Sequence, residues 1–346
     1  MAVAEDIEKH AEPGAGNHIT RRVLGSPTLR LAGRRLLAAL PVLWGVTFLT
    51  YVVMNLLPGD AAQELLGANA TPAEVHQLEV QLHLNEPFWE RYGTWLGGVF
   101  HGSLGTSLVN GEDVTTILGA RLPVTVELLL YAFVVSIVLA VGLAVLVARW
   151  PNGNMDRISL VISMMGLSVA PYVLALVLIY LFAVKVQWFP AIGYTPLSVS
   201  PVENIKSLTL PAIAIGFPLF AVYTRLLRAD IVEQTQREDY IVTARAKGVR
   251  PWRVVLRHAL PNSMFGLITL VALNLGTLIG AVAIIEPIFS IPGVGDILVQ
   301  SINAHDVPVV EGIVVIFAVV VVVANLLADI LYAALDPRIR YGHAAS

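Results

Sequence analysis

Residues 123–148 read PVTVELLLYAFVVSIVLAVGLAVLVA and contain one charged side chain, Glu127. A helix needs about 20 apolar residues to cross the roughly 30 Å hydrocarbon core of a bilayer, so this stretch is long enough to span one. The rest of the chain has the same character, because 56% of its 346 residues are hydrophobic, 14% are charged and the mean hydropathy is +0.73. The sequence therefore predicts an all-α membrane protein.

The same criterion, applied to the whole sequence, predicts six membrane-spanning helices. They lie at residues 36–57, 123–148, 158–184, 207–224, 263–285 and 309–331. The fourth is the shortest and contains Pro211, Gly216 and Pro218, which predicts a kinked or broken helix.

The distribution of Lys and Arg predicts the orientation of the spans, since cytoplasmic loops carry the excess of these residues. With the N-terminus inside, 18 of the 22 basic residues fall in segments on the cytoplasmic side. The four on the other side are Arg91, Arg121, Lys185 and Lys206. Both termini are therefore predicted to be cytoplasmic.

These spans divide the chain into regions. The regions are a cytoplasmic extension at 1–35, the first span at 36–57, an extracytoplasmic segment at 58–122, a core of five spans at 123–334 with a cytoplasmic loop at 225–262, and a cytoplasmic tail at 335–346. The extracytoplasmic segment is too long for a simple connection, so it is predicted to be partly helical.

Two short helices are expected in that segment. Thr71-Pro72-Ala73-Glu74 has the capping-box pattern with Pro at the first helical position, which predicts a helix to about Leu84. Asn85-Glu86-Pro87 then begins a second helix, on which aromatic and apolar residues recur at helical spacing. This stripe favours packing on the spans or on the membrane interface, and direct contact with a partner protein is the alternative.

The cytoplasmic loop, RLLRADIVEQTQREDYIVTARAKGVRPWRVVLRHALPN, is highly charged yet long enough to be structured. The sequence predicts a short helix from about Glu238 to Lys247, with Gly248 as its C-terminal cap. Pro251 opens another turn or two, which Pro261 is predicted to end. A short amphipathic helix parallel to the membrane would fit a groove on a cytoplasmic partner, whereas a loop that only enforces topology is the alternative.

The loop resembles a known family of bacterial transport proteins. Gly248 is followed, after nine residues, by His258-Ala259-Leu260-Pro261, similar to the G-x9-I-x-L-P pattern of ABC importer permeases, with His258 at the Ile position. Upstream, Val242-Thr243-Ala244 keeps only the last residue of that family's Glu-Ala-Ala. EDYIVTARAKG at 238–248 resembles the dipeptide and oligopeptide subfamily of these permeases more closely. Four further stretches are similar to that subfamily's signatures: Leu57-Pro58-Gly59-Asp60, Gly105-Thr106-Ser107, Glu286 with 289–295, and 336–341.

The resemblance implies that this chain lies in the bacterial inner membrane and that its loop helix docks on a cytoplasmic ATP-binding subunit. The ATP-binding subunits are the product of one gene or of two. It places Glu238, Asp239, Tyr240, Ala244, Lys247 and Gly248 at the coupling surface, while Leu260 and Pro261 anchor the return into the fifth span. It also implies a second permease subunit, an extracytoplasmic substrate-binding protein and contact with membrane lipid. The substrate is expected to be a dipeptide or oligopeptide, with nickel complexes, glutathione and haem as alternatives.

The resemblance implies a transport subunit rather than an enzyme. The sequence contains no G-x4-G-K-[ST] phosphate-binding pattern, so ATP and Mg²⁺ are expected to be used by the partner ATPase, with no cofactor bound by this chain. The eight His have no zinc-ligand spacing, Cys is absent, and the net charge of −3 gives no reason to expect nucleic acid as a partner. Asp296 lies in a G-x-G-D sequence found in intramembrane aspartyl proteases. Its place after a Pro-Gly turn argues against proteolysis, and no span offers a mid-membrane Tyr-Asp partner.

Polar groups inside the spans are candidate functional sites. Glu127 and Asp329 lie near span ends, where we expect structural roles. Asn274 precedes Gly276 and Gly280, a pattern that favours close helix packing and leaves pore lining as the alternative. An ion-coupled secondary transporter is the alternative class of protein. Such transporters usually carry intramembrane charges or unwound segments for the coupling ion, and this sequence predicts almost none.

Overall fold

The computed structural model describes residues 27–57, 61–67, 69–148, 150 and 153–335, and within these it is helical, with one isolated bridge between Thr106 and Asp113. The helices are α2 Pro27–Leu56, α3 Ala61–Leu66, α4 Pro72–Gln81, α5 Phe88–Phe100, α6 Val114–Ala148, α7 Asn154–Ser168, α8 Pro171–Leu178, η1 Ile179–Lys185, α9 Pro201–Arg237, α10 Asp239–Ala246, α11 Pro251–Val254, η2 Val255–Ala259, α12 Leu260–Phe289, α13 Val294–Asn303 and α14 Val307–Leu335. By length and composition, the described part has five helices able to cross a membrane, or up to seven if each of two bent pairs is one span.

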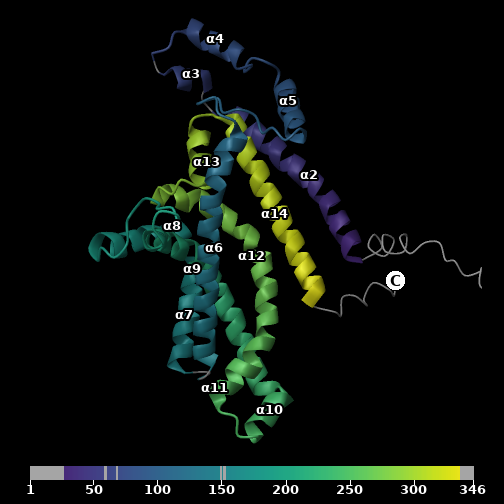
Figure 1. Cartoon of the computed structure of the whole chain (residues 1–346), viewed down its shortest axis with the longest axis vertical. Coiled ribbons are helices and arrows are strands. Elements are labelled where there is room, and N and C mark those ends of the chain that lie inside the picture. Colours follow the sequence, from purple (N-terminus) through teal and green to yellow (C-terminus); the bar gives the residue numbers. More distant parts are fainter. Residues whose placement is uncertain (1–26, 58–60, 68, 149, 151–152, 336–346) are drawn as a thin grey trace, which may run out of the picture.

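Helices α6 and α9 form the centre of the bundle, and α7 and α12 pack against α9 (Figure 1). Helix α14 packs between α12 and α2. Helices α3–α5 lie at one end of the bundle, and α10 and α11 lie at the opposite end. Small residues allow the closest crossings. A Cβ on Gly216 of α9 would lie 2.8 Å from the Ala132 carbonyl of α6, and a Cβ on Gly166 of α7 would lie 2.5 Å from the Ala221 Cβ. Close backbone approach thus holds α9 between its neighbours.

The third predicted span, 158–184, is wrong as a single straight helix. The structure divides it into α7 and the α8–η1 pair, which meet at an angle of 110°. Pro171 explains the break, because a proline disfavours helical geometry in the residue before it. Ala170 is extended accordingly, with φ −66° and ψ 138°.

The fourth predicted span is found as part of a helix, but the break predicted within it is wrong. Residues 207–224 lie inside α9, which runs unbroken for 37 residues and contains both Pro211 and Pro218. A proline removes one helical hydrogen bond, but packing on three neighbouring helices can compensate for that loss. Leu210, Ala212 and Leu219, which flank the two prolines, are buried in this packing.

A buried carboxylate fixes the turn between α12 and α13. Glu286 is 0% exposed, and its oxygens accept hydrogen bonds from the Thr125 hydroxyl (2.7 Å) and the backbone N–H groups of Gly295 (2.6 Å) and Asp296 (3.3 Å). Thr125 in turn accepts from the Val294 N–H at 2.8 Å. These bonds satisfy the first N–H groups of α13 and place a negative charge at its positive end. The chain therefore turns by 79° between the last part of α12 and α13.

Two glycines make that turn sterically possible. A Cβ on Gly293 would lie 2.1 Å from a Glu286 oxygen, and one on Gly295 would lie 2.7 Å from the Ala283 Cα. Contacts this short cannot be accommodated without moving the carboxylate or the backbone. The Pro-Gly-x-Gly sequence and Glu286 are consequently parts of one structural unit.

A second buried carboxyl group lies in α14 and was missed by the sequence interpretation. Glu311 is 0% exposed, and neither of its carboxyl oxygens has a hydrogen-bond partner among the described residues. Its position in the predicted span 309–331 was the available signal.

Glu127, by contrast, accepts hydrogen bonds from Tyr194 (2.6 Å) and Asn204 (2.7 Å), which agrees with the structural role expected of it. Burial, with this hydrogen bond, raises the pKa of Tyr194 to about 12. The side chain of Asp329 lies outside the described part of the structure.

The two helices predicted in the 58–122 segment are confirmed as α4 and α5. Thr71 and Glu74 form the capping box, and the hydrogen bonds from the backbone and hydroxyl of Thr71 lower the pKa of Glu74 below its usual value. Tyr92 of α5 lies 3.0 Å, oxygen to oxygen, from Thr47 of α2, and aromatic rings on both helices pack together, so the stripe on α5 faces a span. Helix α3 was not predicted.

The contrast between the two buried acids can be tested by paired substitutions. Both Glu286 oxygens accept hydrogen bonds, and Glu286→Gln replaces one of them by an NH2 group that cannot accept, so we expect a loss of about 2–3 kcal/mol in the free energy of unfolding. Glu311→Gln removes no hydrogen bond within the described structure and should cause no such loss. Thermal unfolding of the detergent-solubilised variants measures both. Equal destabilisation by the two substitutions would contradict the capping role of Glu286.

Candidate functional site

The connection between α9 and α12 folds as the short helix α10, a tight turn and a return helix. Residue Glu238 is extended (φ −86°, ψ 127°) and separates α10 from α9. At the other end Gly248 has φ +76°, and the Val249 N–H donates to the Ala244 carbonyl at 3.2 Å. This bond pattern with a left-handed glycine is the Schellman termination. The helix predicted from Glu238 to Lys247 is thus confirmed to within a residue at each end.

The return into the membrane differs from the prediction. Pro261 was expected to end the turns that Pro251 begins, but the chain stays helical from α11 through η2 into α12. A proline clashes with the carbonyl four residues earlier in an α-helix, and the wider π-type turn at 255–259 relieves such a clash. The loop therefore connects to the fifth predicted span through a continuous helical segment.

Tyr240 fixes the orientation of α10. Its hydroxyl donates to the Gln234 side chain of α9 at 2.5 Å and accepts from Asn262 of α12 at 2.9 Å. Ile241 is 1% exposed and Ala244 is 7% exposed, so both face the chain's own helices. Helix α10 is consequently held against both flanking helices.

The opposite side of α10 is exposed. Its residues, together with the following turn, include both polar and apolar groups: Glu238, Asp239, Val242, Thr243, Ala246, Lys247, Gly248 and Trp252 are exposed. Acidic groups lie where the helix begins and a basic group where it ends, as the helix dipole favours. Exposed Val242 (59%) and Trp252 (45%) add apolar contact area at the end of the bundle.

A buried ion pair supports the α10 end of α9. Arg228 donates to both carboxyl oxygens of Asp156 in α7, in one bond at 2.7 Å from Nη2, and Asp156 is 2% exposed. Two parallel bonds between a guanidinium and a carboxylate fix direction as well as distance. Sequence reasoning missed this pair, because its members are 72 positions apart.

The remaining predicted site residues lie elsewhere. Leu260 is half-buried and Pro261 is exposed at the start of α12. Asn274 donates to the Leu270 carbonyl of its own helix at 2.8 Å. Gly276 contacts α14, with Val321 3.7 Å from its ideal Cβ position, whereas Gly280 has no atom within 4 Å of that position. The structure therefore brings the α10 residues together and leaves Asn274, Gly276 and Gly280 on a separate part of the bundle.

The part of the chain that the structure describes has no cluster of His, Asp and Glu able to hold a metal ion. At the α10 end, the Tyr240 hydroxyl and the Arg228–Asp156 ion pair hold α10 and α9 in position.

Comparison with known proteins identifies the family. Residues 136–341 match the family described as binding-protein-dependent transport system inner membrane component, and residues 28–129 match the N-terminal region of such membrane components. The chain belongs to this family, and it is a multi-pass protein of the inner membrane. Permease subunits of this kind are not themselves enzymes and bind no cofactor, and the family implies partner subunits.

Relatives named as peptide permeases confirm the resemblance found in the sequence. The chain is 37% identical over 308 residues to a putative peptide transport system permease protein of Brucella abortus, covering 89% of this chain and 98% of the relative. It is 36% identical over 333 residues to a dipeptide transport system permease protein of Alkalihalophilus pseudofirmus (90% and 100%). It is 34% identical over 308 residues to a glutathione transport system permease protein of Pectobacterium atrosepticum (89% and 98%).

Proposed function

We propose that this chain is the pore-forming permease subunit of an ATP-binding-cassette importer for dipeptides or oligopeptides. The observation that carries the coupling mechanism is α10, an exposed short helix held in place by Tyr240, Ile241 and the Gly248 turn. Docking of α10 on an ATPase subunit would transmit closure of the ATPase to α9 and α12, because α10 is hydrogen-bonded to both.

The docking surface proposed here is the exposed side of α10 and its turn. Glu238, Asp239, Lys247 and Gly248 lie on it, with Val242 and Trp252 as apolar contacts. Tyr240 and Ala244 act from behind that surface, since the first is hydrogen-bonded to the flanking helices and the second is buried. Leu260 and Pro261 begin the helix that returns to the membrane.

We propose six membrane crossings with both termini in the cytoplasm: α2, α6, the bent α7–α8 pair, α9, α12 and α14. In this topology residues 58–113 lie outside and α10 lies inside, which agrees with the opposite ends of the bundle that these segments occupy (Figure 1). The Lys and Arg bias of the loops supports the same orientation. Residues 1–26 and 336–346 complete the proposed cytoplasmic extension and tail.

The peptide substrate is proposed from the relatives, two of which are named for peptide and dipeptide transport. Glutathione is the second candidate, because a relative of nearly equal identity is named for it. Completion of the pathway requires a second permease subunit, an ATP-binding subunit that uses ATP and Mg²⁺, and a substrate-binding protein outside the membrane.

The energy source can be tested in right-side-out vesicles that contain the assembled transporter, with ATP either loaded into the lumen or absent. We expect uptake of a labelled dipeptide to require ATP on the α10 side and to continue when an ionophore collapses the ion gradients. Competition by excess glutathione separates the two substrate candidates. Uptake that needs no ATPase subunit and stops with the ion gradient would instead indicate a secondary transporter.

Coupling through α10 can be tested with Gly248→Asp. Both Gly248 (φ +76°) and Gly67 (φ +83°) follow a helix and have no atom within 4 Å of an ideal Cβ, so Gly67→Asp is a matched control at the opposite end of the bundle. We expect Gly248→Asp to reduce peptide transported per ATP hydrolysed at least tenfold, because a carboxylate at the docking surface blocks close contact.

The control should keep the wild-type ratio, and both variants should reach the membrane in normal amount. Absence of Gly248→Asp from the membrane would identify the loop as a topology device. An unchanged ratio of peptide transported to ATP hydrolysed in Gly248→Asp would show that α10 takes no part in coupling.

A further inference from the structure

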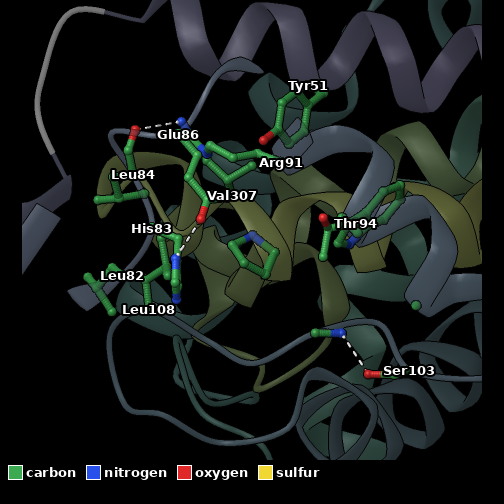
Figure 2. Close-up of a pocket in the computed structure, with 14 residues that line it drawn as sticks. Tyr51, Leu82, His83, Leu84, Glu86, Arg91, Thr94, Ser103, Leu108 and Val307 are labelled. Atoms are coloured by element: carbon green, nitrogen blue, oxygen red, sulfur yellow. Dashed lines mark hydrogen bonds and ion pairs between the residues drawn. The ribbon is translucent and has the colours of Figure 1, made fainter. Parts of the chain in front are cut away.

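A pocket of about 560 Å³ lies at the α5 end of the chain, beside the first turn of α14 (Figure 2). Its walls come from the top of α2, the turn between α4 and α5, α5 itself, the loop after α5, and α14. This volume lies in the range of pockets that hold small ligands. These five parts of the chain build one cavity on the side proposed to face outward.

The pocket contains a guanidinium group that has no carboxylate partner among the described residues. Nη1 of Arg91 donates to the Leu84 carbonyl at 3.2 Å and to Oδ1 of Asn55 at 3.5 Å, and its Cζ lies 5.9 Å from the centre of the Tyr51 ring. Among the described residues, Arg91 has no ion-pair partner. Its Nε and Nη2 donors therefore remain available for an anion.

A carboxylate lines the same pocket without pairing with Arg91. Oε1 of Glu86 is 2.7 Å from Nδ1 of His83, both at the mouth between α4 and α5. Apolar and aromatic side chains also line the pocket, namely Tyr51, Leu84, Trp95 and Val307. The Trp95 N–H is already donated to the Leu104 carbonyl at 3.2 Å, so the ring serves as a wall.

This combination fits the end of a short peptide. A planar guanidinium binds a carboxylate through two parallel hydrogen bonds, and apolar walls accept a side chain without selecting its sequence. We infer that the pocket binds a free carboxylate through Arg91, and that the carboxylate is the C-terminus of the transported peptide on its way into the permease. The inference rests on the proposed function, because outward exposure and a peptide substrate are parts of it.

The probe for this site is a dipeptide of alanine and benzoylphenylalanine, used as the free acid and as the C-terminal amide. Each is photolysed with the assembled transporter in nanodiscs, without binding protein or ATP, and labelled residues are identified by mass spectrometry. We expect the acid to label the pocket at least fivefold more than the amide. Arg91→Gln should abolish this preference, and Arg91→Lys should keep part of it.

Equal labelling of the wild-type pocket by acid and amide would overturn the proposal, and this comparison needs no variant to fold. An acidic side chain of the binding protein is the other source of a carboxylate. In that case Arg91→Gln would weaken binding-protein affinity at least tenfold while the acid-to-amide ratio of the wild type stays near one, which would also overturn the peptide assignment. Labelling is independent of ATP, so its failure is distinct from a failure of ATP-driven uptake.

Discussion

The need to satisfy backbone polar groups away from water governs this structure. Where the chain must turn between α12 and α13, the buried Glu286 carboxylate accepts the N–H groups that the new helix leaves open, and Thr125 of α6 supplies one more acceptor. The same bonds tie α6, α12 and α13 together. Gly293 and Gly295 leave the space that the carboxylate needs, so a short motif fixes the positions of three helices.

At the opposite end, polar side chains fix α10 relative to the bundle. The Tyr240 hydroxyl bridges α9 and α12, and the Arg228–Asp156 pair joins α9 to α7. Movement of α10 would therefore be transmitted to helices that run through the bundle. This rigid connection is what a coupling helix requires, because force applied at a flexible loop would be lost in local motion.

Much of this arrangement could be predicted from the sequence, for identifiable reasons. Capping boxes, terminal glycines and long apolar runs are local signals, so α4, α5, α10 and the long apolar helices α2, α6, α12 and α14 were found. The break at Ala170 and the unbroken α9 were not, because proline has opposite consequences depending on how its neighbours pack. Contacts distant in sequence, such as Arg228 with Asp156, leave no local pattern, and the sequence likewise did not show that Ala244 is buried.

The central claim is that the exposed side of α10 contacts an ATPase subunit. Because the chain contains no cysteine, a single Lys247→Cys substitution gives one reactive thiol on that surface. Thr116→Cys, in the first turns of α6, gives a matched thiol at the opposite end of the bundle. A short crosslinker that carries a maleimide and a diazirine, attached to the introduced thiol and photolysed in the assembled transporter, should join Lys247→Cys, but not Thr116→Cys, to the ATP-binding subunit. No product from Lys247→Cys, or equal product from both, would contradict the account.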